Sequence, residues 1–107
     1  MTDSNKIAAP LNVTPGGEVI EGAVYFLGIG GIGMSALARY FNNKGVKVSG
    51  YDKTSTALTR QLEAEGMHIH YVDDVELIDR DAKIIVYTPA IPANHSELNY
   101  YRNNNYT

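Results

Sequence analysis

The chain has 107 residues, a formal net charge of −3 and 44% hydrophobic residues. This length suffices for one small domain with its own core and is too short for two. The charge balance argues against nucleic-acid binding, and the absence of cysteine excludes disulfides and thiolate metal sites. We expect a cytoplasmic protein that does not enter a membrane.

Residues 1–21 differ in composition from the rest of the chain. They lack the apolar run of a signal peptide and combine prolines and paired glycines with small polar residues. We therefore predict a flexible leader, or a tail added for expression, at residues 1–21 and one folded domain at residues 22–107.

A strand is predicted at residues 23–27, because this stretch is apolar throughout, as is typical of a parallel strand covered on both faces. A glycine-rich turn follows it directly. Gly28, Gly30 and Gly33 have the G-x-G-x-x-G spacing of a phosphate-binding turn between a strand and a helix. A helix that begins near Ile32 would direct its free amide groups and the positive end of its dipole at this turn. The turn is therefore predicted to bind a diphosphate.

The glycine turn is also compatible with a purely structural role or with a P-loop. A P-loop requires lysine where this chain has Met34, so ATP hydrolysis at this turn is not expected. A phosphate site is favoured over a structural turn because the glycines follow a strand and open a helix. In this interpretation a side chain at Gly30 would take the place of the phosphate, and Gly33 would let the helix pack closely on the strand.

The helix after the glycines should lie on the sheet through one apolar face, formed by Met34, Leu37, Ala38 and Phe41. Gly45 should end this helix. A second strand is predicted at residues 46–51, and Asp52 follows it, 19 residues after Gly33. An acid at this place in a dinucleotide-binding fold hydrogen-bonds a ribose hydroxyl, whereas the alternative is a solvated aspartate beside a helix cap. Lys53 could equally contact phosphate or be solvated.

A second helix, capped by Thr54 or Ser55 and ended by Gly66, should lead to a third strand at residues 67–71. The two histidines of this strand would share one face. Histidines at this spacing can hold a metal, but no third histidine or cysteine stands nearby, so no metal site is predicted. His70 lies nearer the carboxyl end of the strand and is the better candidate for contact with a ligand.

The acidic residues between positions 73 and 81 lack the glycine-containing spacing of a calcium loop and are interpreted as a solvated connection. A fourth strand at residues 83–87 leads into the proline-containing segment 88–92. In open α/β sheets the loops at the carboxyl ends of the strands line the ligand crevice. The segment from Thr88 to Ile91 should therefore lie beside the glycine turn.

A third helix should begin at Asn94, where Glu97 would complete a capping box and His95 would be exposed. Strands and helices thus alternate, which predicts an α/β fold: a Rossmann-like three-layer parallel sheet that is half of a doubly wound nucleotide-binding fold. The sequence shows no arrangement of nucleophile, paired carboxylates or metal ligands suited to catalysis. We predict a binding domain without catalytic residues.

Three segments closely resemble the N-terminal domain of the Mur ligase family: FLGIGGIGMSALA at 26–38, VSGYD at 48–52 and YTPAI at 87–91. The resemblance extends over residues 23–107. It implies that the glycine turn holds the diphosphate of UDP-N-acetylmuramic acid, and that residues ending the second and fourth strands help to hold the uridine. The residues so implied as substrate-binding are Gly28, Ile29, Gly30, Gly31, Ile32, Gly33, Asp52, His70, Thr88, Pro89, Ala90 and Ile91.

The resemblance also implies an activity for the full-length enzyme. ATP, with magnesium, would convert the muramyl carboxylate into an acyl phosphate, and the amine of L-alanine would attack it during cytoplasmic peptidoglycan synthesis. The central and C-terminal domains that perform these steps would be the partners of this domain, which alone should need no cofactor and be inactive. Alternatives are an NAD-binding regulatory module, which would use the same glycines and Asp52, a fragment of a nicotinamide-dependent dehydrogenase, and the Mur ligase that recycles murein peptides.

Overall fold

A sheet of four parallel strands organises this computed structural model, which describes residues 22–104. β2 (Ala23–Leu27) lies between β3 (Lys47–Tyr51) and β5 (Ala82–Tyr87), and β4 (His68–His70) pairs with β3 in the order β4-β3-β2-β5. All four strands therefore end at the same edge of the sheet. The parallel sheet predicted from the sequence is confirmed, whereas the predicted leader lies outside the described residues.

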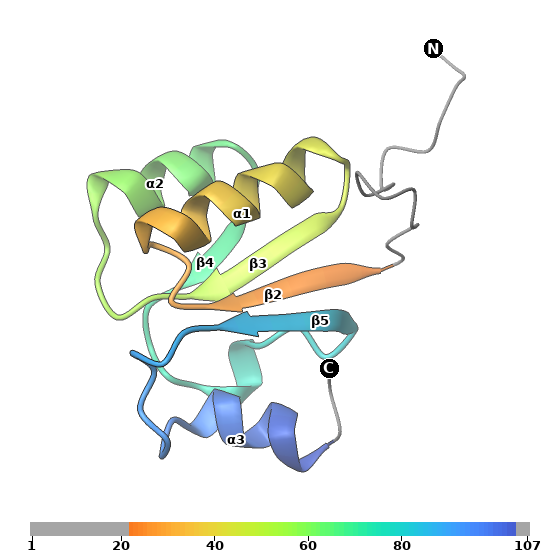
Figure 1. Ribbon diagram of the computed structural model, residues 1–107, viewed down its shortest axis with the longest axis vertical. Coiled ribbons are helices and arrows are strands. Elements are labelled where there is room, and N and C mark those ends of the chain that lie inside the picture. Colours follow the sequence, from red (N-terminus) through yellow and green to blue (C-terminus); the bar gives the residue numbers. More distant parts are fainter. Residues whose placement is uncertain (1–21, 105–107) are drawn as a thin grey trace.

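Helices cover both faces of the sheet, which confirms the three-layer arrangement. α1 (Ile32–Asn43) and α2 (Ala57–Ala64) lie on one face, and α3 (Ser96–Asn103) lies on the other (Figure 1). The connection from β4 to β5 contains only the short 3-10 helix η1 (Val75–Leu77), on the same side as α3.

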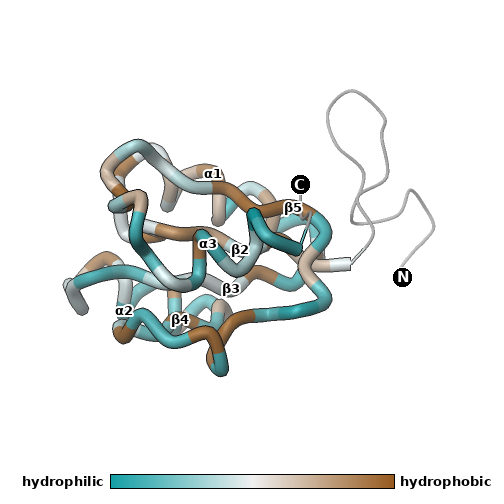
Figure 2. Tube along the Cα trace, turned by 90° about the horizontal axis from the view of Figure 1, so that it is seen from below, coloured by the Kyte–Doolittle hydropathy of each residue, from teal (hydrophilic) through white to brown (hydrophobic). Residues whose placement is uncertain are grey.

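The central strand β2 separates two hydrophobic clusters. Val24 and Phe26 pack with residues of α1 and α2, whereas Tyr25 and Leu27 face Leu98 of α3 on the other side. All five residues of β2 are buried, as the continuous apolar run predicts. α3 itself is largely hydrophilic (Figure 2), so part of its attachment to the sheet is made by polar groups.

α1 begins at Ile32 as predicted and is followed by Gly45, whose φ of +82° suits glycine at a helix C-terminus. Its buried residues are Ser35, Ala38 and Phe41, with Met34 partly buried against the same cluster. The prediction that Leu37 faces the sheet is wrong, since its side chain is 39% exposed.

α2 is capped by Thr56 and not by Thr54 or Ser55. The Thr59 amide donates to Thr56 Oγ1 at 3.1 Å, and the Thr56 amide donates to Thr59 Oγ1 at 2.8 Å, which completes a reciprocal capping box. The helix starts later than predicted because the amide of Thr54 turns back to the Asp52 carboxylate at 3.2 Å.

The glycine that permits close packing is Gly50 in β3, not Gly33 as predicted. A Cβ atom at Gly50 would lie 2.6 Å from the carbonyl oxygen of Phe26 on the neighbouring strand, whereas a Cβ atom at Gly33 would have no atom of the described residues within 4 Å.

Gly33→Ala should therefore be tolerated and should raise the free energy of unfolding by up to about 1 kcal/mol, because alanine is the better helix former. Urea unfolding followed by circular dichroism measures this change. Gly50→Ala is the contrasting variant and should be clearly destabilised. A loss of stability in Gly33→Ala would mean that α1 packs more tightly there than the structure shows.

Candidate functional site

A crevice of about 710 Å³ lies at the carboxyl ends of the strands. Its walls come from the glycine turn after β2, residues 51–53 at the end of β3, Asp73 after β4, the segment after β5 and the beginning of α3. The loops after β2 and β5 meet here because their strands are adjacent and parallel.

The segment after β5 lies beside the glycine turn, as predicted. Thr88, Ala90 and Ile91 line the crevice, whereas Pro89 does not. A Cβ atom at Gly28 would lie 3.7 Å from Ile91 Cδ1 and 3.8 Å from Thr88 Oγ1, and the φ of +92° at Gly28 is one that glycine readily adopts. The two segments therefore form one continuous wall.

Most amides of the glycine turn are already hydrogen-bonded within the protein. The amides of Gly28 and Ile29 both donate to the carbonyl oxygen of Tyr51, at 2.8 and 3.1 Å. The amide of Gly31 donates to the carbonyl oxygen of Gly28 at 3.2 Å. The side chain of Ile29 is fully buried. These bonds hold the turn in shape and leave its first amides unavailable to a ligand in this conformation.

Within the glycine turn and the first turn of α1, the amides of Ile32, Gly33 and Met34 have no hydrogen-bond acceptor among residues 22–104. A helix N-terminus with free amides attracts anions, because the N–H groups and the helix dipole both favour negative charge. α1 carries no acidic residue in its first turn and no side-chain cap. It therefore presents an open anion site beside the crevice, whose wall includes the N-cap residue Gly31 but not Ile32, Gly33 or Met34.

The N-terminus of α3 also borders the crevice, but it is already occupied by an anion. The Asp73 carboxylate accepts hydrogen bonds from the amides of Ser96 at 2.8 Å and Glu97 at 3.1 Å. A second anion there would be repelled by Asp73. Of the two helix N-termini at the crevice, α1 is thus the one suited to a phosphate group.

Asp52 is held between the glycine turn and the end of β3. Its Oδ2 accepts from the Gly30 amide at 2.7 Å, and its Oδ1 accepts from the Thr54 amide at 3.2 Å. Each carboxylate oxygen has two lone pairs, so the oriented carboxylate can still accept hydrogen bonds from hydroxyl groups in the crevice. The exposed Lys53 lines the crevice next to it.

Position 30 has room only for glycine, because two side chains of the protein lie close to it. A Cβ atom there would lie 2.7 Å from Asp52 Oδ2 and 2.7 Å from Thr59 Cγ2, and Thr59 is fully buried. A side chain at Gly30 would therefore displace Asp52 and disturb the cap of α2, whether or not it also reached the place of a phosphate.

The predictions that His95 is exposed and that the third helix begins at Asn94 are wrong. His95 is the N-cap residue of α3 in place of Asn94, and it is buried, with 6% of its surface exposed. Its ring packs edge-on against Tyr51 with 4.6 Å between the ring centroids, and its Nδ1 lies 3.3 Å from Asp73 Oδ1. Burial, followed by the charges of nearby carboxylates, raises the pKa of Tyr51, so its phenol stays neutral.

Sequence reasoning missed five residues that line this crevice: Tyr51, Asp73, Pro92, Asn94 and His95. Asp73 follows the end of β4 as Asp52 follows the end of β3, so the same positional rule could have found it. His95 carried no such signal, because its burial depends on a contact with Tyr51.

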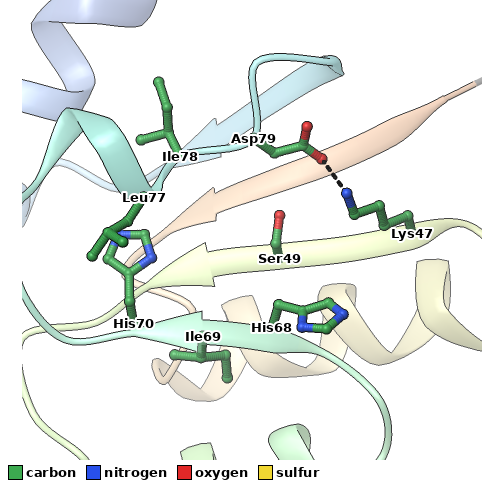
Figure 3. Close-up of a pocket in the computed structure, with 8 residues that line it drawn as sticks. All are labelled: Lys47, Ser49, His68, Ile69, His70, Leu77, Ile78 and Asp79. Atoms are coloured by element: carbon green, nitrogen blue, oxygen red, sulfur yellow. Dashed lines mark ion pairs between the residues drawn. The ribbon is translucent and has the colours of Figure 1, made fainter.

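His70 is not brought to the crevice. It lies in a separate hollow of about 370 Å³ on the α3 side of β3 and β4, where Figure 3 shows it with Leu77 at one end and the Lys47–Asp79 ion pair at the other. Its Nε2 is 2.8 Å from Glu97 Oε2 and 3.1 Å from Tyr25 Oη. The described geometry thus gives His70 a structural role.

Glu97 is the centre of a buried polar network and forms no capping box. Its Oε1 accepts from the Tyr25 hydroxyl at 2.7 Å, and its Oε2 accepts from the Asp74 amide at 2.9 Å in addition to contacting His70. Burial, followed by the hydrogen bond to Glu97, raises the pKa of Tyr25 and keeps its hydroxyl a donor. The network joins β2, β4 and α3.

The prediction that the acidic residues between positions 73 and 81 form a solvated connection is wrong, because several of them have partners within the protein. Asp73 caps α3, Asp74 accepts from the Glu76 amide to cap η1, and Asp79 pairs with Lys47. Within residues 22–104 no group of three histidine, cysteine, aspartate or glutamate side chains is placed to hold a metal ion. The same residues include no helix with the length and hydropathy needed to span a membrane.

Comparisons with known proteins agree with this geometry. Residues 23–107 match the family model described as "Mur ligase family, catalytic domain". The UDP-N-acetylmuramate–L-alanine ligase of Cytophaga hutchinsonii is 54% identical over 78% of this chain and 19% of its own length, and that of Parabacteroides distasonis is 56% identical over 75% and 18%. The chain thus spans about a fifth of the curated relatives it matches.

Solved structures show the same likeness. The crystal structure of the UDP-N-acetylmuramate–alanine ligase of Thermotoga maritima superimposes with a TM-score of 0.73 at 30% identity, covering 78% of this chain and 19% of that one. A murein peptide ligase from Psychrobacter arcticus gives a TM-score of 0.71 at 22% identity over 79% of this chain and 18% of that one, which shows the fold alone.

Proposed function

Because the chain belongs to the Mur ligase family, we propose that it is the N-terminal substrate-binding part of a ligase that joins L-alanine to UDP-N-acetylmuramic acid. Its crevice would hold the UDP moiety. The names of its relatives in Cytophaga hutchinsonii and Parabacteroides distasonis support this substrate over the alternative of NAD.

The observation that carries the proposal is the open N-terminus of α1. The amides of Ile32, Gly33 and Met34 have no acceptor in the described residues, and the neighbouring helix N-terminus is filled by Asp73. A diphosphate would bind to these amides, with the rest of the glycine turn (Gly28, Ile29, Gly30 and Gly31) as its wall.

The uridine would extend from the diphosphate along the ends of β3 and β5. The Asp52 carboxylate, already oriented by two amides, would accept hydrogen bonds from ribose hydroxyls. Thr88, Ala90 and Ile91 would contact the nucleoside from the other wall. We do not extend this role to His70, because its Nε2 faces Glu97 and Tyr25.

ATP and magnesium would be bound by other parts of the complete ligase. The residues present here do not fit either group, because the glycine turn has Met34 in place of the P-loop lysine and the described acidic residues form no cluster of metal ligands. The contribution of this chain to the reaction would be to bind and orient the nucleotide-linked substrate, in the cytoplasm and together with the remaining domains.

The proposal is tested by nitrogen–proton NMR titration of the chain with UDP-N-acetylmuramic acid, UDP and NAD in parallel. We expect UDP-N-acetylmuramic acid and UDP to shift the amides of Ile32, Gly33 and Met34 and of residues near Asp52. Amides near His68, in the separate hollow, serve as the internal control and should not move. A response to NAD alone would favour a regulatory dinucleotide-binding module and contradict the proposal.

A further inference from the structure

His70 uses one ring nitrogen within the protein and leaves the other open. Its Nε2 lies 2.8 Å from Glu97 Oε2 and 3.1 Å from Tyr25 Oη. The Tyr25 hydroxyl donates to Glu97 Oε1 and the Asp74 amide donates to Glu97 Oε2, so both carboxylate oxygens act as acceptors. The proton in the contact between His70 and Glu97 therefore belongs to Nε2. In the neutral ring, Nδ1 then carries a lone pair.

This lone pair is available in the hollow of about 370 Å³ on the α3 side of β3 and β4. Nδ1 of His70 has no hydrogen-bond partner among residues 22–104, and it does not belong to the buried polar atoms of those residues that lack a partner. It is therefore accessible, in contrast to both ring nitrogens of His95. Figure 3 shows the imidazole standing on the face of β4 that borders the hollow.

Glu97 supplies a negative charge behind this ring. Its side chain is fully buried, and no lysine or arginine among residues 22–104 lies within ion-pair distance of its carboxylate. A buried carboxylate of this kind favours a positive charge on its neighbour. Histidines that bind metals commonly donate their second ring N–H to a carboxylate, which fixes the ring and makes the binding nitrogen more basic. His70 and Glu97 have this arrangement.

His68 provides a second imidazole on the same face of β4. Side chains two residues apart on a strand stand side by side, about 7 Å apart along the strand, so two imidazoles can reach one ion. The ring of His68 is turned away from His70 in Figure 3, and it must change rotamer to meet a shared ion. His68 is exposed and lines the hollow, which leaves room for this change.

We propose that His70 Nδ1 and a ring nitrogen of His68 bind a divalent transition-metal ion such as Zn²⁺, with water completing its coordination. Imidazole suits zinc, nickel and copper, whereas Mg²⁺ prefers oxygen ligands. Residues 22–104 place no third histidine, cysteine or carboxylate here, so binding should be weaker than at a structural zinc site with four protein ligands. The hollow shares no lining residue with the crevice, and the inference does not depend on the proposed function.

The test titrates the parent chain and His68→Ala with Zn²⁺, and separately with Mg²⁺, followed by NMR of the imidazole nitrogens. In the parent, Zn²⁺ should move the resonances of His68 and of His70 Nδ1, and those of the buried His95 should stay in place. His68→Ala removes an exposed side chain and should fold as the parent does. It should bind Zn²⁺ at least about tenfold more weakly, because losing a ligand costs no less than losing a ligand's supporting carboxylate.

Glu63→Gln, which removes an exposed carboxylate from α2 on the opposite face of the sheet, is the matched control and should bind Zn²⁺ as the parent does. Zn²⁺ should also raise the midpoint of thermal unfolding of the parent and of this control more than that of His68→Ala, because an ion that binds the folded state stabilises it.

Three outcomes would overturn the inference. The first is equal Zn²⁺ affinity in the parent and His68→Ala. The second is a response of His68 and His70 to Mg²⁺ that matches their response to Zn²⁺. The third concerns the metal-free parent: a nitrogen spectrum that placed the proton of neutral His70 on Nδ1 would remove the lone pair on which the site depends.

Discussion

Gly31→Asp is expected to weaken UDP binding by at least about 100-fold while the fold is retained. Gly31 is the N-cap residue of α1 in an extended conformation (φ −65°, ψ 153°) that any residue can adopt. A Cβ atom there would meet its nearest neighbour, the carbonyl oxygen of Gly28, at an ordinary 3.6 Å. The substitution is therefore sterically acceptable.

The loss arises because aspartate is itself a preferred N-cap residue. Its carboxylate would accept hydrogen bonds from the first-turn amides of Gly33 or Met34, which are the donors proposed for the diphosphate. It would also bring a negative charge to the place where the phosphate charge must lie. Stability should rise by a few tenths of a kcal/mol, since the helix gains a cap.

Gly31→Asn and Gly31→Ala separate these contributions. Asparagine caps the helix without a charge and should cost roughly tenfold in affinity, whereas alanine offers no cap and should leave binding nearly unchanged. NMR titration gives the affinities, and urea unfolding shows that all three variants are folded. If the aspartate and alanine variants bound UDP equally well, the N-terminus of α1 would not be the anion site.

The elements and their order could be predicted because they depend on local chemistry. The apolar run Ala23–Leu27 indicates a buried strand, Gly45 marks the end of α1, and the alternation of strands and helices predicts a parallel sheet. The meeting of the turn after β2 with the segment after β5 followed from a general rule of parallel sheets. These predictions needed no knowledge of side-chain partners.

The details of the site could not be predicted, because they depend on partners distant in sequence. Asp73 caps α3 from 23 residues away, and Tyr25 reaches Glu97 across 72 residues. The spacing of the glycines did not reveal that the carbonyl oxygen of Tyr51 accepts hydrogen bonds from the amides of Gly28 and Ile29. Because of these bonds, the free amide donors lie in the first turn of α1 and not in the glycine turn. Leu37 shows the same limit: helical periodicity placed it on the apolar face of α1, and only the packing shows that it is 39% exposed.

Glu97→Ala is expected to lower the free energy of unfolding by about 3–5 kcal/mol, because it leaves three buried or part-buried polar groups without their acceptor. These groups are the hydroxyl of Tyr25, Nε2 of His70 and the amide of Asp74. Small domains are stable by only about 5–15 kcal/mol, so this variant should be close to unfolding at room temperature. Urea unfolding at neutral pH measures the change.

Glu97→Gln tests whether the carboxylate or only its shape is needed. Glutamine can keep an oxygen for the Tyr25 hydroxyl, but its amide group would then face His70 Nε2 and the Asp74 amide, and the latter is itself a donor. Its loss of stability should therefore lie between those of the parent and the alanine variant. Glu63→Ala, which removes an exposed glutamate from α2, is the matched control and should change stability by less than about 0.5 kcal/mol. Equal stability of the Glu63 and Glu97 alanine variants would mean that α3 is held to the sheet by its apolar contacts alone.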